Sequence, residues 1–577
     1  MPARTLPIAL LGILLGLSCC AGKVEETQPA ETQAVPRAEA EVRSGRVRLL
    51  VPAGEGSRPE YARLAAELDR AAGEMVRRVG GAPDESPLTV LIEGDHVAQA
   101  RSAGDIGEAV PGPRADLHLV WHPDDLPAYR FALARVLVAR AGIGKQLPPW
   151  FERGAALWLS RDWYGRTYSD WLPLLARARV LPEPEQLLLA AYAPWPRDAS
   201  TLLWTPAAAA VVERLPGATV AEKLREIPMR ERVAATLNAL TKASNVGKGA
   251  SPSPTRKPEM PSAFMKGVSL AMLNRVEEGY HAPAVDRQLE RLHSLGANAV
   301  SLMPFAGQAA VDRPEMRYLS RHPASETDIG LIHAARRARA RGFLILWKPH
   351  LWVRGSWTGE IAMKSEADWV LWWKGYRRYV LHHALLARWA GADLFSVGVE
   401  LSKTLGRERE WRELIADVRL FFPGPVTYSA NWYGDLESAP FWDSLDVIGV
   451  DAYFPLSASP EAKRADLEAG ARQIAQRLEA TWRRHRKPVL LTEVGFPAHR
   501  GAWIEPHTEG GEYSEADQAL AYQALFKGLG RPSWLAGTFL WKAFSGEGGD
   551  RGSADFRFLG RQAEAAVREY YSGRRLP

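Results

Sequence analysis

The chain has 577 residues, of which 46% are hydrophobic and 24% are charged, a composition typical of folded protein rather than of disordered or collagen-like chains. Its 73 basic residues exceed its 67 acidic residues by only 6 and are mixed with them along the chain, which argues against nucleic-acid binding. The only cysteines are Cys19 and Cys20, so a disulfide framework, a cysteine-ligated zinc site and thiol catalysis are excluded. The length favours two or three domains.

Residues 1–20 are predicted to be a bacterial lipoprotein signal peptide. Arg4 supplies the positive start, and residues 8–17 form an apolar stretch too short to span a bilayer comfortably. The following Leu17-Ser18-Cys19-Cys20 resembles a lipobox, in which the cysteine after the cleavage point carries the lipid. Cys20 fits best, because Leu17 then lies three residues before it. The alternative is an ordinary secretory signal with incidental cysteines.

Residues 21–43 are rich in Glu, Ala, Thr and Pro and have almost no large apolar side chains. This composition predicts a flexible tether. The protein is therefore expected to be an exported lipoprotein of the cell envelope, attached to the membrane through its lipid. Ala21 after Cys20, rather than Asp, favours the outer membrane or the periplasmic face, by analogy with lipoprotein sorting.

Residues 44–240 are predicted to form an α+β domain with a helical second half, followed by a linker over residues 241–262. The first part has strand-like apolar runs, and the second part has helical patterns. The linker contains Ser, Gly, Pro and Lys without periodic hydrophobic residues. The expected strands are residues 47–51 and 88–92, and the expected helices are residues 128–141, 150–158 and 207–214.

The segment LPPWFERGAA, residues 147–156, resembles the third-ligand helix of gluzincin metallopeptidases. In that family a preceding helix carries two zinc-binding His and a catalytic Glu. The resemblance puts Phe131, Ala132 and Arg135 at those positions and leaves only Glu152 of the set. Phe and Arg cannot hold the metal. We therefore expect a degenerate peptidase-like domain without zinc or peptidase activity, acting as a spacer or as a surface for a protein partner.

Residues 263–577 alternate eight strand-like runs with helical stretches, which is the size and rhythm of a (β/α)8 TIM barrel. A doubly wound sheet would usually carry a Gly-rich phosphate loop after its first strand, and none is present. The expected strands are residues 267–272, 299–303, 343–347, 394–399, 426–430, 447–450, 489–491 and 538–541. The expected helices include residues 284–295, 332–341, 368–390, 408–421, 463–484 and 515–528.

Two carboxylates follow apolar runs at the ends of predicted strands, Glu400 after strand four and Glu493 on strand seven. Chemistry in a TIM barrel lies at the C-terminal ends of the strands. A buried Glu at a strand end is costly unless it is partnered or used. Two such groups meeting at one barrel mouth fit the paired carboxylates of glycoside hydrolysis. Either Glu alone is equally well explained as a structural residue at the start of a loop.

Residues 266–570 resemble glycoside hydrolase family 113, a clan A family of retaining β-mannanases. Besides the two Glu, the match includes Lys348-Pro349-His350, Ser429-Ala430-Asn431-Trp432, residues 449–453 (GVDAY) and Leu540-Trp541-Lys542. Clan A enzymes commonly carry Asn before the acid/base residue, where it holds the sugar 2-hydroxyl. Val399 stands there in this chain and removes that contact.

The resemblance implies a role for each of these residues. Glu400 would be the acid/base and Glu493 the nucleophile, and neither a metal nor another cofactor is needed. Tyr453 would hydrogen-bond the nucleophile, and Trp541 would form the aromatic floor of the cleavage subsite. The sugar-binding set would further include Lys348, His350, Asn431, Trp432 and Asp451. From the residues alone, the alternatives are that Tyr453 and Trp541 are core aromatics and that His350 is a structural hydrogen-bonding residue.

Tryptophan is frequent, with 21 copies, and six copies cluster near the predicted strand ends and neighbouring helices. Some are expected to be stacking platforms for sugar rings and others to be core residues. The six are Trp347, Trp352, Trp357, Trp372, Trp373 and Trp432.

Two functions of different class remain. The favoured one is a surface-tethered hydrolase of a β-linked glycan, of the β-1,4-mannan type. The alternative is a non-catalytic glycan-binding or scaffold lipoprotein with a decayed active site. Because the barrel keeps both carboxylates while the first domain has lost its metal-binding side chains, the sequence favours the enzyme.

Overall fold

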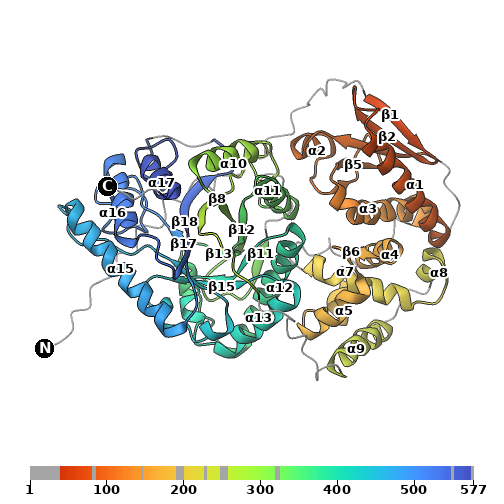
Figure 1. The fold of residues 1–577 in the computed structure, drawn as a ribbon. Helices are drawn as coiled ribbons and strands as arrows, with labels where there is room; N and C mark the ends of the chain where they lie inside the picture. The colour runs from red at the N-terminus through yellow and green to blue at the C-terminus, as the bar shows by residue number, and fades with distance from the viewer. Residues whose placement is uncertain are drawn as a thin grey trace.

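The computed structural model describes residues 39–80, 86–143, 147–189, 200–225, 230–246, 258–318, 325–547 and 552–573. Two parts lie side by side in Figure 1: a mixed domain built from residues 39–246 and a barrel built from residues 258–573. The predicted signal peptide, with the lipidation site Cys20, lies outside the described residues. In the described part of the chain, none of the helices has the length and apolar character needed to cross a membrane.

The first domain opens with a five-stranded sheet in the order β1-β2-β3-β5-β4. Strands β2, β3 and β5 are parallel, and the edge strands β1 and β4 are antiparallel to their neighbours. The strands and the two helices of this part are β1 (Glu39–Ser44), β2 (Val47–Pro52), α1 (Pro59–Val79), β3 (Leu88–Glu93), α2 (His96–Ala103), β4 (Ala109–Val110) and β5 (Leu117–Val120). The burial of Val47, Leu49 and Val51 alternates along β2, as expected of a strand with one face on the core.

The second part of this domain is mostly helical. Its elements are α3 (Leu126–Val138) with a π-helical turn (Ala139–Ile143), α4 (Pro149–Ser160), β6 (Asp162–Trp163), β7 (Arg166–Thr167), α5 (Tyr168–Arg177), α6 (Pro184–Leu189), α7 (Ser200–Arg214), α8 (Val220–Arg225) and α9 (Arg230–Val246). Helices α4 and α7 pack closely because Gly154 lets the α7 backbone approach: a Cβ on Gly154 would lie 2.7 Å from the carbonyl oxygen of Ala208.

The structure differs from the sequence prediction at both predicted linkers. Strand β1 begins at Glu39, inside the expected tether, and pairs with β2. Ala40 and Val42 are partly buried against the core while Glu41 and Arg43 are exposed, so a short alternating pattern was hidden in a polar composition. At the other boundary, α9 continues to Val246, within the segment expected to be linker.

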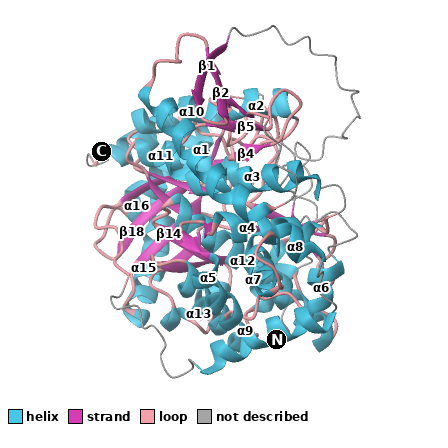
Figure 2. Ribbon diagram, turned by 90° about the vertical axis from the view of Figure 1, so that its right-hand side faces the viewer, coloured by secondary structure: helices cyan, strands magenta, loops and turns pink. Residues whose placement is uncertain are grey.

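The barrel is a closed parallel sheet in the order β12-β14-β15-β16-β17-β18-β8-β9. All eight strands predicted from apolar runs form it, so the TIM-barrel prediction is confirmed. The strands are β8 (Met265–Ala271), β9 (Ala299–Leu302), β12 (Leu344–Trp347), β14 (Leu394–Val399), β15 (Val426–Asn431), β16 (Ile448–Asp451), β17 (Val489–Val494) and β18 (Leu535–Phe544). Figure 2 shows the barrel strands and the first domain's strands as separate groups, with helices around them.

Helices cover the outside of the barrel, and the six expected ones are present with small shifts at their ends. The six are α10 (Ala284–Leu295), α11 (Asp328–Ala340), α12 (Glu366–Ala390), α13 (Glu408–Phe421), α15 (Arg464–His485) and α16 (Glu515–Leu529). The structure adds the short α14 (Asp435–Ser438) and α17 (Ala563–Ser572). Helix α12 begins where Ser365 accepts a hydrogen bond from the Asp368 amide, and it ends at Gly391 with φ 72°. A small additional sheet is formed by β10 (Phe305–Gln308), β11 (Met316–Tyr318) and β13 (His350–Val353).

The two domains contact each other through aromatic rings and an ion pair. Trp171 of α5 stacks on Phe421 of α13 with ring centroids 5.8 Å apart. The Arg336 guanidinium of α11 lies 2.7 Å from Asp125, whose side chain is nearly inaccessible. Both polar and apolar groups are buried at this boundary, which indicates that the two domains are docked against each other rather than moving independently.

Candidate active site

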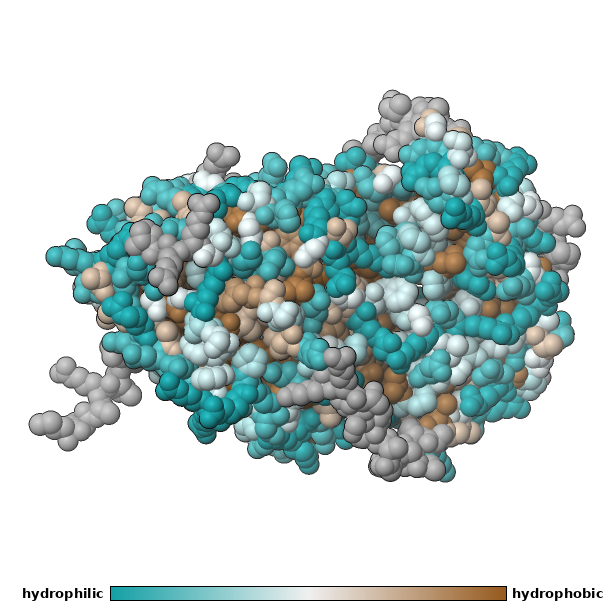
Figure 3. All heavy atoms as spheres, in the orientation of Figure 1, coloured by the Kyte–Doolittle hydropathy of each residue, from teal (hydrophilic) through white to brown (hydrophobic). Residues whose placement is uncertain are grey.

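The two predicted catalytic carboxylates lie at the C-terminal ends of barrel strands. Glu400 follows directly after β14, and Glu493 lies near the end of β17. Asp451, the last residue of β16, is the register partner of Glu493. Lys348 follows β12. Because parallel strands end at the same rim of a barrel, residues far apart in sequence meet here. Figure 3 shows hydrophobic residues gathered over the middle of the barrel half, within a largely hydrophilic surface.

Glu493 is held by two hydrogen-bond donors and is almost completely buried, with 5% of its surface exposed. Lys348 Nζ donates to Glu493 Oε1 at 2.6 Å, and the Tyr453 hydroxyl donates to Oε2 at 2.7 Å. Both donors stabilise the ionised carboxylate. Tyr453 thus makes the contact that the family resemblance implies for it.

Lys348 links Glu493 to a second buried carboxylate, that of Asp451. Its Nζ also donates to Asp451 Oδ1 at 2.8 Å, and Thr492 donates to the same oxygen at 2.7 Å. Burial lowers the pKa of Lys348, but the negative charges of Asp451 and Glu493 outweigh it and raise the pKa overall. Burial and the charge of Glu493 raise the pKa of Asp451 to about 7. Lys348 and Asp451 have no exposed surface, so in this structure they hold Glu493 in place from within the barrel wall.

Glu400 has a different environment. Asn431 Nδ2 donates to its Oε1 at 2.9 Å, and Trp357 Nε1 donates to its Oε2 at 2.8 Å. Both of these donors are neutral, in contrast to the lysine at Glu493. Burial, together with the charges of Asp451 and Glu493, raises the pKa of Glu400 to about 8. At neutral pH Glu400 is therefore protonated, as a general acid must be.

The backbone at Glu400 is held in an unusual conformation. Its φ is 51°, in the left-handed region that a non-glycine residue adopts at a cost of about 1–2 kcal/mol. Its amide donates to the Ser429 carbonyl at 2.9 Å, and the next amide, of Leu401, donates to the Tyr428 hydroxyl at 2.7 Å. The pairing of β14 with β15 also shifts register between Ser396 and Val399. These contacts fix the direction of the Glu400 side chain.

Aromatic residues surround the carboxylates. The His350 ring lies between Phe305, at 4.8 Å, and Trp541, at 6.4 Å and nearly parallel. Burial and the neighbouring Lys348 charge lower the pKa of His350 well below its usual value, so this imidazole is neutral. Trp541 is only partly buried, as a surface that stacks on a sugar ring requires.

Trp432 and the other tryptophans expected near the site differ in their exposure. Trp432 is partly exposed and packs edge-on against Phe454, and its neighbour Tyr433 is 77% exposed. Of the other tryptophans considered as stacking platforms, Trp352 is exposed, whereas the rings of Trp347, Trp372 and Trp373 are buried in the core.

Sequence reasoning misses two functional contacts. It presents Trp357 only as a possible stacking platform, yet the Trp357 indole donates to Glu400. It does not single out Thr492, next to the nucleophile candidate, although the Thr492 hydroxyl holds Asp451. A hydroxyl residue directly before a strand-end Glu is only a weak sequence signal for the Thr492 contact. The loop that carries Trp357 contains no sequence signal for its contact with Glu400.

The first domain brings together the four positions compared with a zinc site. Phe131, Ala132 and Arg135 lie on α3 and Glu152 lies on α4, and Arg135 Nε donates to Glu152 Oε1 at 2.7 Å. A guanidinium therefore neutralises the one carboxylate that remains of the ligand set. Across the described ranges, no group of three or more His, Cys, Asp or Glu side chains is arranged to hold a metal ion.

The comparisons with known proteins concern the barrel. Residues 272–547 match the model of Glycoside Hydrolase Family 113. A β-mannanase of that family from Alicyclobacillus acidocaldarius is 26% identical, with 54% of this chain and 97% of that chain covered and a TM-score of 0.49. A β-1,4-mannanase of the family is also 26% identical, with 54% and 99% covered and a TM-score of 0.48.

A β-glucuronidase from Bifidobacterium dentium is 16% identical, with 54% of this chain and 46% of that chain covered and a TM-score of 0.36. No curated protein matches the chain. The peptidase-like first domain is not among these matches, so its relationship stays a prediction. The family match, which spans the strands carrying Glu400 and Glu493, identifies the barrel as a glycoside hydrolase domain.

Proposed function

We propose that the protein is a retaining hydrolase of a β-linked polysaccharide or oligosaccharide, of the β-1,4-mannan type, tethered to the cell envelope. The family match over residues 272–547 supports the mannan-type substrate, since the related enzymes that share 26% identity are named as β-mannanases. The aromatic and polar side chains around Glu400 and Glu493 form the sugar site in this proposal.

The reaction proceeds in two displacements. The Glu493 carboxylate attacks the anomeric carbon while Glu400 donates its proton to the leaving glycosidic oxygen, so that a glycosyl ester on Glu493 forms as the glycosidic bond breaks. Glu400, now ionised, takes a proton from a water molecule whose oxygen attacks the same carbon and releases Glu493. Two inversions leave the product with the configuration of the substrate.

The observation that carries the proposal is the contrast between the two carboxyl groups. Glu493 receives a charged and a phenolic donor, which hold its carboxyl group in place. Glu400 receives two neutral donors, and burial with neighbouring negative charge raises its pKa to about 8. This difference in hydrogen-bond donors, and the raised pKa of Glu400, assign the acid role to Glu400 and the nucleophile role to Glu493.

The other assigned residues act around this pair. Trp541 supports the sugar ring at the cleavage point, and His350 and Asn431 meet its hydroxyls. Asn431 now donates to Glu400, so a sugar hydroxyl would share or replace that bond. Val399, which is buried, offers no polar contact where the resemblance implies an Asn, and a weaker grip on the sugar 2-hydroxyl is expected.

The substrate is tested by incubating the full chain with oligomers of β-1,4-mannan, glucomannan, xylan and cellulose, with Glu493→Gln as the inactive control. Cleavage of mannan and glucomannan oligomers by the wild type alone is the expected result. Cleavage of none of the four, with binding retained, would favour the alternative of a non-catalytic glycan-binding lipoprotein.

The envelope location rests on the predicted lipobox. In this proposal the lipid on Cys20 holds the chain at the membrane, and the first domain is a spacer or a surface for a protein partner. The barrel then works on glycans that reach the outer membrane or the periplasmic face.

A further inference from the structure

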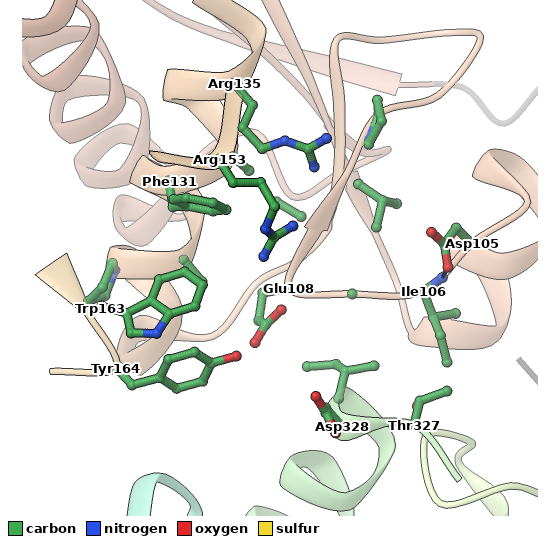
Figure 4. Close-up of a pocket in the computed structure, with 18 of the residues that line it drawn as sticks. Asp105, Ile106, Glu108, Phe131, Arg135, Arg153, Trp163, Tyr164, Thr327 and Asp328 are labelled. Atoms are coloured by element: carbon green, nitrogen blue, oxygen red, sulfur yellow. Dashed lines mark hydrogen bonds between the residues drawn. The ribbon is translucent and has the colours of Figure 1, made fainter. Parts of the chain in front are cut away.

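A cavity of about 440 Å³ lies between the two domains and is separate from the sugar site of the barrel. Its walls come from the loop of residues 105–111, from α3 and α4, from the β6–β7 hairpin and from the start of α11 (Figure 4). None of the residues that contact Glu400 or Glu493 lines it. Its volume falls within the range of about 300–1,000 Å³ that is typical of small-molecule sites.

One side of this interdomain pocket is aromatic. Phe131 and Trp163 meet edge to face, with ring planes at 67° and centroids 5.1 Å apart, and Tyr164 of the hairpin meets Trp389 of α12 at 5.6 Å. Tyr164 has a φ of 50°, so the tip of the hairpin holds a bulky ring in a conformation that normally suits glycine or asparagine. The pocket therefore presents aromatic faces and edges from both domains.

The other side is polar and carries hydrogen-bonding groups of both kinds. In Figure 4 the Arg153 guanidinium, the Glu108 carboxyl and the Tyr164 hydroxyl extend into the same space. Arg153 also lies over the Phe131 ring at 5.4 Å, and its Nε donates to Thr205 at 3.3 Å. Guanidinium nitrogens donate and carboxylate oxygens accept, whereas a tyrosine hydroxyl does both.

Acidic side chains outnumber basic ones around the pocket, with Asp105, Glu108, Glu152, Asp162 and Asp328 against Arg135 and Arg153. Arg135 is paired with Glu152 at 2.7 Å, and Asp328 lies 2.8 Å from His382. Burial, with the nearby charges of Asp125 and Asp328, raises the pKa of Glu108 to about 7. An anionic occupant is therefore disfavoured, whereas the hydroxyl groups of a neutral ligand can donate to the carboxyl oxygens and accept from Arg153.

We propose that the interdomain pocket is a second, non-catalytic carbohydrate site that holds a short neutral oligosaccharide. Aromatic faces pack on the apolar faces of sugar rings, and Glu108 and Arg153 offer an acceptor and donors to pairs of hydroxyls. Because Thr327, Asp328 and Trp389 of the barrel complete the walls, binding requires the docked arrangement of the domains and stabilises it.

The test counts sugars bound to the full chain carrying Glu493→Gln, by isothermal titration with mannotriose and, separately, with cellotriose. The proposal expects one site in the barrel and one in the pocket. Adding Ala128→Phe fills the pocket from α3 and should remove one of the two sites. The matched control Ala66→Phe, on the exposed face of α1, should keep both.

Four further measurements on three variants separate the possible outcomes. Ala128→Phe in the otherwise wild-type chain should leave glycan hydrolysis unchanged, and its melting temperature shows whether the domain still folds. If that variant does not fold, Glu108→Ala should weaken pocket binding about tenfold. Trp541→Ala should weaken only the barrel site, so a failure of the proposed function and a failure of this proposal give different patterns.

The proposal is overturned if only one sugar binds per chain and pocket substitutions do not affect it. It is also overturned if neither trisaccharide binds outside the barrel but trialanine does, with that binding lost in Ala128→Phe. The pocket would then be a peptide site.

Discussion

Lys348 is predicted to be the residue on which the nucleophile depends most. It lies 2.6 Å from Glu493 and 2.8 Å from Asp451, and it is fully buried. Replacing it in Lys348→Met keeps most of the volume and leaves two adjacent carboxylates without their shared cation. Removing one partner of a buried ion pair typically costs about 3–5 kcal/mol of stability.

The same change affects the pH dependence of the reaction. At an effective dielectric constant of about 20, two unit charges 4 Å apart interact by about 4 kcal/mol, which equals about 3 pKa units. The carboxylate pair should therefore hold a proton to higher pH, and the acidic limb of the kcat/KM profile should move up by about 2–3 pH units.

The assay combines urea unfolding with a pH–rate profile. In Lys348→Met/Asp451→Asn the excess negative charge is gone, and most of the lost stability and much of the acidic limb should return. Lys364→Met removes an exposed lysine paired with Asp312 and should change neither measurement. An unchanged acidic limb in Lys348→Met, at full stability, would refute the reasoning.

Four further predictions concern the acid, the pH range, the metal and the anchor. Glu400→Gln should slow poor leaving groups far more than activated aryl glycosides; equal losses on both would contradict its role as acid. Wild-type kcat/KM should fall as pH rises through about 8, where Glu400 loses its proton. In the folded chain Glu400 keeps this proton up to about pH 8, whereas in the unfolded chain its carboxyl group loses the proton near pH 4.5. The free energy of unfolding should therefore decline as the pH rises from about 4.5 to about 8. The decline should be smaller in Glu400→Gln, which has no such proton to lose. Elemental analysis of the purified chain should find no stoichiometric zinc, and one tightly held zinc would contradict the loss of the metal site at Phe131, Ala132 and Arg135. Cys20→Ser should move the protein from the membrane to the soluble fraction with activity unchanged, and continued membrane attachment would mean that Cys19 or another signal is used.

The barrel was predictable because its strands are buried on both faces. Each reads as a short apolar run, and the helices between them have clear amphipathic patterns. The short strands β4, β10, β11 and β13 lie outside the barrel and each directly follows a Pro or a Glu, so no extended apolar run marks them. Strand β1 was not predicted because its partly buried residues, Ala40 and Val42, lie in a polar segment.

The sequence indicated which carboxylates would lie at the barrel mouth, but it did not indicate most of the contacts that hold them. The strand-end positions of Glu400 and Glu493 indicated the carboxylate pair. The left-handed backbone at Glu400 and the Lys348–Asp451 bond depend on register shifts and on residues that only the closed barrel brings together. The interdomain pocket could not be predicted, because it exists only where Tyr164 of the first domain meets Trp389 of the barrel.

The central claim is that Glu493 forms a covalent intermediate with Glu400 as acid and then base. Its most direct test is the anomeric configuration of the first product, followed by NMR during cleavage of a β-1,4-manno-oligosaccharide. The account predicts that the β-configured product appears first and then mutarotates, as for carboxyl groups about 5–5.5 Å apart. An α-configured first product would contradict it, since that requires a water between carboxyl groups about 6.5–9.5 Å apart.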